Sequence, residues 1–240
     1  MDIRDKVVLI TGASGGIGLA TARSFAGEGA KVALVARSAD KLNEIADGLR
    51  REGCEAIAIA ADVRDAAQVK RAVAETTRHF GRIDILINNA GQSAADMVAD
   101  INLDDFRQLT DLNVFAPLAA MQAVIPVMRE HGGGLILNVS SMVSKMRIPG
   151  LAAYAATKAA LNALTDTARV ELAADNIRVI LVFPRTTATD LGKNSLGNAE
   201  LRQRQRERAH AQATVDTAEF AAGKILAAAI VEPDEQYMDA

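Results

Sequence analysis

Short apolar runs alternate with longer helical patterns along most of the chain, and this alternation limits the folds open to it. The runs are rich in Val and Ile and too short for ordinary helices, so they predict β-strands: Val7–Ile10, Val32–Ala36, Ala56–Ala60, Ile83–Ile87, Leu135–Val139 and Val179–Phe183. Amphipathic or alanine-rich stretches between them predict helices over 17–28, 40–51, 66–80, 104–130 and 154–174. The sequence therefore predicts a doubly wound parallel sheet with right-handed crossovers and helices on both faces.

Composition fits such a core and argues against several classes of protein. Half of the residues are hydrophobic but only 3% are aromatic, so the core must be built from Ala, Val, Ile and Leu, as in a buried parallel sheet. The net charge of −3 gives no bulk attraction to nucleic acid or to acidic membranes. No apolar run approaches the roughly 18–20 residues that span a bilayer, so we expect neither a nucleic-acid nor a membrane partner.

The numbers and positions of cysteine and histidine residues bear on the redox state of the protein's compartment and on metal binding. Cys54 is the only cysteine, which excludes an intrachain disulfide and favours a reducing compartment. The first residues are charged and lack the apolar stretch of a signal peptide, so a soluble cytoplasmic protein is expected. His79, His131 and His210 are too widely spaced to suggest a metal site.

A glycine-rich turn follows the first predicted strand directly and leads into a helical pattern. It reads Thr11-Gly12-Ala13-Ser14-Gly15-Gly16-Ile17-Gly18. Glycine permits unusual backbone angles and close approach, and a helix N-terminus offers free N–H groups to a pyrophosphate. This context favours nucleotide binding over a purely structural turn. The spacing is G-x-x-x-G-x-G, which differs from the common dinucleotide fingerprint.

The end of the second predicted strand bears on which nucleotide is bound. An acidic residue there would hydrogen-bond a ribose 2′-hydroxyl and repel a 2′-phosphate. Ala36 occupies that position and is followed by Arg37 and Ser38, a guanidinium and a hydroxyl that suit a phosphate dianion. We therefore expect NADP(H). The alternative is that Arg37 is only a solvated side chain at a strand end.

Tyr154 and Lys158 form the strongest candidate for a catalytic pair. Four residues apart on an alanine-rich helix, they lie on one face. A neighbouring ammonium and an oxidised nicotinamide ring would lower the pKa of the phenol, which suits general acid–base catalysis. Ser141 follows the strand Leu135–Val139, at the edge of the sheet where ligands bind. Its neighbour Ser140 is the rival candidate for binding a substrate oxygen.

Together these motifs resemble the short-chain dehydrogenase/reductase family, whose members carry T-G-x-x-x-G-x-G and Y-x-x-x-K. The resemblance covers residues 6–184 and implies a Rossmann-type fold and hydride transfer between nicotinamide and a carbonyl or alcohol carbon. It implies that Tyr154 is the general acid and base, that Ser141 orients the substrate, and that Lys158 binds the ribose and tunes Tyr154. A non-catalytic NADP-binding sensor is the alternative, but such a protein would be expected to lose the tyrosine or the lysine.

Asn113 matches the family's fourth catalytic residue. Pro117 has no N–H to bond to the carbonyl of residue 113, so that carbonyl is left free and the helix should bend there. The resemblance implies a water on this carbonyl that relays protons to Lys158.

The resemblance also implies a set of cofactor contacts. Asn89, Ala90 and Gly91 lie in an N-N-A-G stretch after the fourth strand, and Asp62 with Val63 would line the adenine pocket. Asp62 could instead cap the helix that starts near Asp65, or do both. The full expected set is Gly12, Ser14, Gly15, Gly16, Ile17, Gly18, Arg37, Ser38, Asp62, Val63, Asn89, Ala90, Gly91, Tyr154, Lys158, Pro184, Thr187 and Thr189.

The chain departs from the family after the sixth predicted strand. Where the family reads P-G-x-V-x-T, this chain has Arg185 in place of glycine and Thr187 in place of an apolar residue. Thr189 keeps the position that contacts the nicotinamide carboxamide in the family. Arginine disfavours the backbone freedom of glycine, so this side of the pocket is expected to differ. Alternatively, Arg185 points into the site and binds an acidic substrate.

One domain over residues 1–240 is expected, because no linker or repeat interrupts the pattern. Residues 186–212 are polar and fall where the family places a substrate lid. The Arg202–Arg208 stretch there gives no single basic stripe, since Arg202 and Arg204 point to nearly opposite sides of a helix, and a solvated lid helix is expected. A helix over 216–231 and a short seventh strand within Glu235–Ala240 would complete the fold. The family's oligomers imply a homotetramer, or a homodimer, paired through 104–130 and 154–174. The substrate is expected to be a small carbonyl or alcohol.

Overall fold

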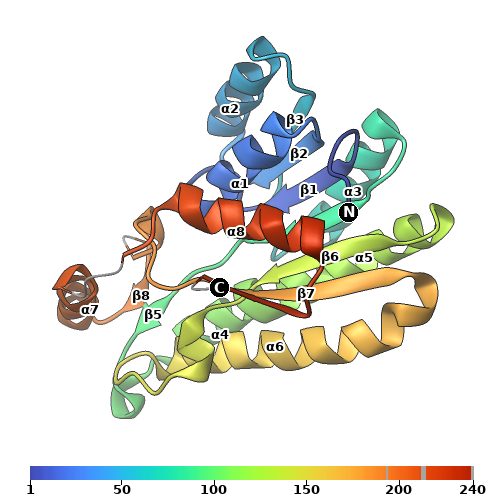
Figure 1. Ribbon diagram of the computed structural model, residues 1–240. Helices are drawn as coiled ribbons and strands as arrows, with labels where there is room; N and C mark the ends of the chain where they lie inside the picture. The colour runs from blue at the N-terminus through green and yellow to red at the C-terminus, as the bar shows by residue number, and fades with distance from the viewer. Residues whose placement is uncertain (193, 212–214, 239–240) are drawn as a thin grey trace.

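The computed structural model describes residues 1–192, 194–211 and 215–238, and its centre is one parallel sheet (Figure 1). Within these residues the sheet is seven-stranded, in the order β3-β2-β1-β4-β6-β7-β9. The strands are β1 (Val7–Thr11), β2 (Lys31–Ala36), β3 (Ala56–Ala60), β4 (Ile85–Asn88), β6 (Gly134–Val139), β7 (Ile177–Phe183) and β9 (Glu235–Tyr237). The predicted doubly wound α/β fold is confirmed, and β9 is the expected short seventh strand.

Helices cover both faces of the sheet, so the strands are buried on both sides. On one face lie α1 (Gly16–Gly27), α2 (Ala39–Arg51) and α8 (Ala218–Val231). On the other lie α3 (Ala66–Phe80), α5 (Ala116–Glu130) and α6 (Ala152–Leu172). Side chains alternate between the two cores along each strand: Val8 and Ile10 pack under the first group of helices, and Val7 and Leu9 under the second. This burial explains why the strands read as continuous apolar runs.

The helix expected over 104–130 is interrupted. It consists of α4 (Leu103–Thr110), a π-helical turn over Asp111–Phe115 and then α5. The Ala116 N–H bonds to the Asp111 carbonyl, five residues back, and Pro117 follows without an N–H to offer. The bend expected from Pro117 thus takes the form of a π turn.

By length and composition this helical stretch, Leu103–Glu130, could cross a membrane. The expectation that no such segment exists counted only uninterrupted apolar runs. A core helix passes the same test, and here α5 packs on the sheet with Ala120, Val124 and Met128 buried.

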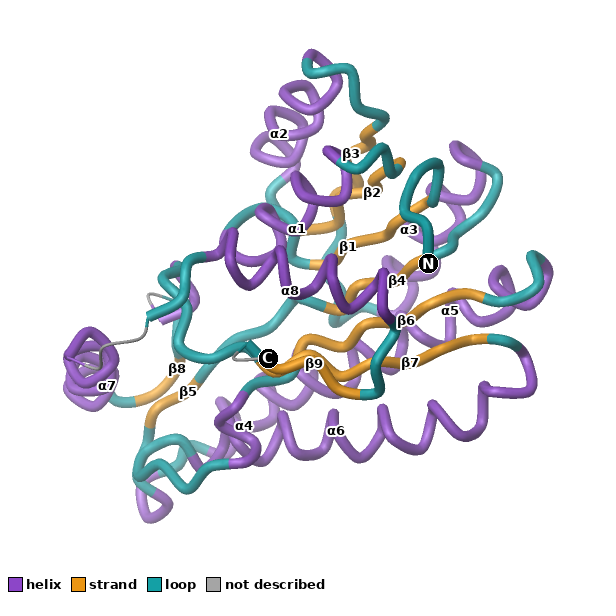
Figure 2. Tube along the Cα trace, viewed as in Figure 1, coloured by secondary structure: helices purple, strands orange, loops and turns teal. Residues whose placement is uncertain are grey.

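A second, two-stranded sheet was not expected. In it β5 (Ala94–Ala95) pairs in parallel with β8 (Leu196–Gly197), on the side of the molecule where α7 (Ala199–Ala211) projects (Figure 2). Gly197 has φ of +87°, and a Cβ there would lie 2.2 Å from an Asp96 carboxylate oxygen, so only glycine fits. A helix, α7, is present in the stretch where a lid helix was expected, although the side chains of Arg206 and Arg208 lie outside the described residues.

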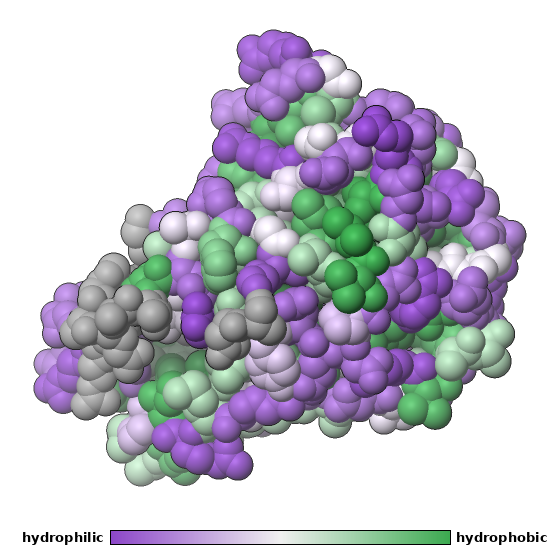
Figure 3. Space-filling model, in the orientation of Figure 1, coloured by the Kyte–Doolittle hydropathy of each residue, from purple (hydrophilic) through white to green (hydrophobic). Residues whose placement is uncertain are grey.

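Apolar side chains reach the surface on two sides of the molecule. Figure 3 shows one group over α8, where Phe220, Ile230 and Val231 are exposed. Leu103 in α4, Phe115 in the π turn and Val170 in α6 are exposed on the other helical layer.

Candidate active site

The strands β1, β2, β4, β6 and β7 all end at one edge of the sheet, and the loops that follow them carry the predicted site residues. Thr11 ties two of these loops together. Its hydroxyl donates to the Ile87 carbonyl at 3.3 Å and accepts from the N–H groups of Asn89 and Ala90 at 3.0 and 3.1 Å. The Gly12 and Asn89 stretches are therefore held as one unit.

Two glycines of the loop, Gly12 and Gly18, have no room for a side chain. Gly12 (φ +69°) approaches Ala90 so closely that a Cβ would lie 2.9 Å from the Ala90 Cα. A Cβ on Gly18 would lie 2.3 Å from the Gly12 carbonyl oxygen. The Asn89 side-chain amide donates to the carbonyls of Thr11 and Gly12 at 3.0 and 3.3 Å, which fixes the turn.

The start of α1 offers what a pyrophosphate needs. The helix begins at Gly16, and its N-cap residue Gly15 has no side chain to cap the first N–H groups. Unpaired N–H groups at a helix N-terminus bind anions. The loop and helix therefore offer free N–H groups at the place where the sequence predicts a phosphate site.

Positive charge gathers where β2 ends. Arg37 and Ser38 are exposed, and neither side chain forms a hydrogen bond with the part of the chain that the structure describes. The Lys41 Nζ lies 3.8 Å from the position that a Cβ on Gly15 would occupy, so a second cation stands beside the phosphate loop. The sequence pattern gave no reason to single out Lys41, which lies in the first turn of α2.

Asp62 and Val63 follow β3 at the same edge. Arg64 bonds to both carboxylate oxygens of Asp62, and these bonds hold the pKa of that carboxyl below its usual range. The helix cap is Asp65, which accepts from the N–H groups of Ala67 and Gln68. The alternative that Asp62 caps α3 is therefore wrong. Val63 is buried in the same core cluster as the apolar side chains of α3.

Tyr154 and Lys158 lie one turn apart near the start of α6, and both side chains are buried. The Lys158 ammonium donates to the Val139 carbonyl at 2.9 Å, directly before the serine loop. Burial lowers the pKa of Lys158 to about 8. Burial also raises the pKa of Tyr154, although its hydrogen bond with Ser141 opposes that rise. The structure thus brings Ser141, Tyr154 and Lys158 together.

The two serines are distinguished by their partners. The Ser140 hydroxyl bonds to Asn162 Oδ1, and the Asn162 amide donates to Ser144, whose hydroxyl donates to the Ser141 carbonyl. Ser140 is thus engaged with Asn162, and Ser141 faces Tyr154. The sequence patterns did not identify Asn162 as a site residue, although it continues the four-residue spacing of Tyr154 and Lys158 along α6.

Asn113 is fully buried in the π turn, and its side chain has a function that the sequence did not predict. It accepts from the Gln92 N–H at 3.0 Å and donates to the Gln92 carbonyl at 2.9 Å and to Thr157 at 3.0 Å. It therefore clamps the backbone that follows Gly91. A Cβ on Gly91 would lie 3.3 Å from Asn113 Oδ1 and 3.5 Å from Lys158 Nζ, so these groups meet at one point.

The loop after β7 completes the edge. The Pro184 carbonyl accepts from the Met142 N–H at 3.0 Å, next to Ser141. The Thr189 methyl carbon lies 3.1 Å from the position of a Cβ on Gly16, so this loop packs against the phosphate loop. The guanidinium of Arg185 forms an ion pair with the carboxylate of Asp216. This pairing does not favour the alternative in which Arg185 points into the site to bind an acidic substrate.

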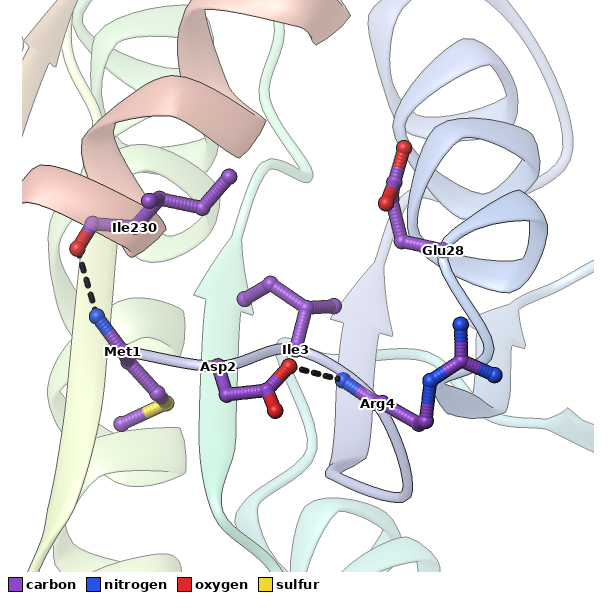
Figure 4. A pocket seen from close by; sticks show the side chains of 6 residues that line it. All are labelled: Met1, Asp2, Ile3, Arg4, Glu28 and Ile230. Carbon is purple, nitrogen blue, oxygen red and sulfur yellow. Dashed lines mark hydrogen bonds between the residues drawn. The ribbon is translucent and has the colours of Figure 1, made fainter.

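Two surface hollows lie away from this edge. One, of about 270 Å³, is lined by Met1–Arg4, Glu28 and Ile230, where the chain start meets the end of α8 (Figure 4). The other is lined by Glu44, Asp47, Arg50 and Arg51 of α2. Neither contains a residue of the candidate site, which is defined by converging polar groups at the strand ends.

The low pKa of Lys158 predicts how stability depends on pH without cofactor. The unfolded chain holds this proton up to a pH of about 10.4, whereas the folded protein releases it near pH 8. Between these values the unfolded state binds more protons, so stability rises with pH. From pH 7 to pH 10 the free energy of unfolding of the wild type should rise by about 2 kcal/mol relative to Lys158→Met. Urea denaturation at several pH values measures this, and parallel curves for the two proteins would contradict it.

Comparisons with known proteins agree with this geometry. A family model described as short chain dehydrogenase matches residues 6–200. A 3alpha-hydroxysteroid dehydrogenase of Mediterraneibacter gnavus is 37% identical over 198 residues, 80% of this chain and 77% of that protein. A solved 7 alpha-hydroxysteroid dehydrogenase with NADH and 7-oxo glycochenodeoxycholic acid has a TM-score of 0.86 at 30% identity, covering 95% of this chain and 89% of the other. L-sorbose reductase from Gluconobacter frateurii with NADPH and L-sorbose has a TM-score of 0.84 at 31% identity, covering 95% and 92%.

Proposed function

The chain belongs to the short-chain dehydrogenase/reductase family, and we propose that it is an NADP(H)-dependent oxidoreductase that interconverts a carbonyl and an alcohol. The observation that carries the proposal is the meeting of buried Ser141, Tyr154 and Lys158 at the sheet edge that also carries the glycine loop. We assign residues 1–240 to one catalytic domain, with residues 186–212 as a substrate lid.

The bound cofactor would supply or accept the hydride at the substrate carbon. In the reducing direction Tyr154 donates its hydroxyl proton to the substrate oxygen, and in the oxidising direction it takes that proton back. Ser141 hydrogen-bonds the same oxygen and orients it. Both hydroxyls are held by rigid elements, since α6 carries Tyr154 and the Asn162 network fixes the serine loop.

Lys158 has two functions in this proposal. Its ammonium binds the nicotinamide ribose, and its charge favours the ionised form of Tyr154. The Asn113 carbonyl would hold a water that returns protons to Lys158. Burial raises the pKa of Tyr154 in the protein alone, and a positively charged oxidised nicotinamide, when bound, would lower it.

The cofactor contacts follow the same edge. The phosphates would bind over Gly12, Ser14, Gly15, Gly16, Ile17 and Gly18, the adenine beside Asp62 and Val63, and the nicotinamide half near Asn89, Ala90, Gly91, Pro184, Thr187 and Thr189. The 2′-phosphate would bind Arg37 and Ser38, with Lys41 as a second cation close by. The solved relatives hold NADH in one case and NADPH in another, so the preference depends on this chain's own charges.

Arg37→Ala should raise the dissociation constant for NADPH by roughly 10–100-fold, because a change of this size corresponds to the loss of one hydrogen bond between charged groups. The dissociation constant for NADH should change little, because NADH lacks the 2′-phosphate. Cofactor fluorescence titration measures both. Arg51→Ala, at the far end of α2, is the matched control and should affect neither cofactor. Equal affinity of the wild-type protein for NADPH and NADH would overturn the preference.

The substrate class is a small carbonyl or alcohol. Relatives named for hydroxysteroids and for L-sorbose direct the choice of test compounds. Oxidation of NADPH should therefore be assayed with ketosteroids, ketoses, simple ketones, aldehydes and 3-oxoacyl esters. Turnover with any of them supports the enzyme. Tight NADPH binding without turnover across the panel would instead favour an NADP-binding sensor.

We also propose a homotetramer or homodimer in the cytoplasm. The exposed apolar side chains of Leu103, Phe115 and Val170 on α4, the π turn and α6 support pairing through these helices. A monomer in light scattering would contradict it. The single cysteine, Cys54, is consistent with a reducing compartment.

A further inference from the structure

The residue that departs most from the family pattern, Arg185, makes the most specific contact at the edge of the site. Its Nε and Nη2 donate to the two carboxylate oxygens of Asp216 at 3.1 and 2.9 Å. The Asp216 side chain is only 8% exposed and that of Arg185 31%. A buried carboxylate needs such a partner, and two parallel bonds fix the geometry of the pair.

The same two segments are also paired through their backbones. The Asp216 N–H donates to the Thr186 carbonyl and the Ala188 N–H donates to the Asp216 carbonyl, both at 2.9 Å. Asp216 directly precedes Thr217, the N-cap residue of α8. The two ends of the lid therefore meet at a joint that the ion pair closes.

This joint is connected to the groups that would hold the cofactor and the substrate. The carbonyl before Arg185, that of Pro184, accepts from Met142 beside Ser141, and the carbonyl of Arg185 itself accepts from the Thr187 hydroxyl at 3.0 Å. Thr189 packs against Gly16 of the phosphate loop. A shift of Arg185 would move all of these contacts.

We propose that Arg185 and Asp216 are positioning residues: their ion pair holds Thr187 and Thr189 against the cofactor and closes the base of the lid. The φ angle of Arg185 is not positive, so this backbone does not use the freedom that a glycine would give. The ion pair supplies the fixed geometry instead. The role in cofactor binding rests on the proposed function, whereas the hold on the lid does not.

The test compares one ion pair with another in the same chain. Asp216→Asn keeps the shape of the side chain and removes only the carboxylate charge that faces Arg185, whose side chain is 31% exposed, so the fold should survive. Arg185→Lys keeps the charge but loses the paired bonds. Arg178→Met is the control: Arg178 pairs with Glu232 at similar exposure, but at the opposite end of β7.

Cofactor binding separates positioning from simple stabilisation. Asp216→Asn should raise the dissociation constant and the KM for NADPH by about tenfold or more, with a smaller change in kcat at saturating cofactor. Arg185→Lys should fall between the wild type and Asp216→Asn. Arg178→Met should lower the melting temperature without changing NADPH affinity. Unchanged affinity in Asp216→Asn, or an equal loss in Arg178→Met, would overturn the cofactor role.

Proteolysis tests the hold on the lid without any cofactor. Trypsin cleavage after Arg202 and Arg204 of α7, followed by mass spectrometry, should be several-fold faster in Asp216→Asn than in Arg178→Met or the wild type. Equal rates would overturn the joint. If the wild type binds neither NADPH nor NADH, the proposed function fails, and these cleavage rates still decide whether the ion pair closes the lid.

Discussion

Tyr154→Phe will lower kcat by roughly 10²–10⁴-fold, the usual contribution of a positioned general acid or base. The substitution removes only the hydroxyl, and the ring remains in the same buried place on α6. The two neighbouring serines cannot replace it, because the Ser140 hydroxyl is bonded to Asn162 and the aliphatic hydroxyl of Ser141 is a much weaker acid than a phenol. The affinity for NADPH should stay close to that of the wild type. Steady-state kinetics and fluorescence titration measure the two effects.

The second tyrosine of the chain provides the matched control. Tyr237 stacks on Phe183 with ring centroids 4.9 Å apart, and its hydroxyl bonds to Glu235. Tyr237→Phe keeps the stacking and loses a hydroxyl that takes no part in the proposed chemistry, so kcat should be unchanged. If Tyr154→Phe kept more than a tenth of the wild-type kcat, another group would have to be the proton donor.

Gly18→Ala will disrupt the phosphate loop. The added methyl carbon would lie 2.3 Å from the Gly12 carbonyl oxygen and 2.4 Å from the Asn89 amide nitrogen, so backbone or helix must move. Overpacking of this kind costs about 1–3 kcal/mol of folding free energy. The shift also displaces the N–H groups at the start of α1, and the dissociation constant for NADPH should rise by at least about tenfold, because charged hydrogen bonds are lost. Urea denaturation and cofactor titration test these effects.

Gly27→Ala is the control in the same helix. A Cβ there meets no atom within 4 Å, and alanine favours helix over glycine by up to about 1 kcal/mol. This variant should be as stable as the wild type or more so, with unchanged cofactor affinity. If Gly18→Ala bound NADPH as well as Gly27→Ala does, the glycine loop would not be the phosphate site.

The sheet and the central part of the site could be predicted from the sequence because each rests on a short-range pattern. Buried parallel strands are continuous apolar runs, and the predicted strands lie within two residues of the observed ones at each end. Tyr154 and Lys158 are four residues apart, and residues at this spacing lie on the same face of any α-helix. The glycine loop can be recognised in the sequence because the strand β1 directly precedes it and the helix α1 directly follows it.

The remaining features depend on contacts between distant segments. The strands β5 and β8 have two residues each, too few for any periodicity, and are 102 residues apart at the Ser93–Ser195 contact. The clamp of Asn113 on Gln92 and the ion pair of Arg185 with Asp216 join residues 21 and 31 positions apart. Among several charges near a strand end, only the folded chain decides which pair forms.

The joint at Asp216 has a consequence for how the substrate range of this protein can change. Since residues 188 and 216 are hydrogen-bonded neighbours, the chain leaves the body of the protein and returns to it at one point. Doubling the length of a flexible loop costs only about 0.6 kcal/mol in closure entropy. Evolution or an engineer could therefore exchange the proposed lid as a cassette, with a different length and a different inner surface, while the sheet and the proposed catalytic residues stay as they are. One scaffold can in this way acquire new substrates without new chemistry.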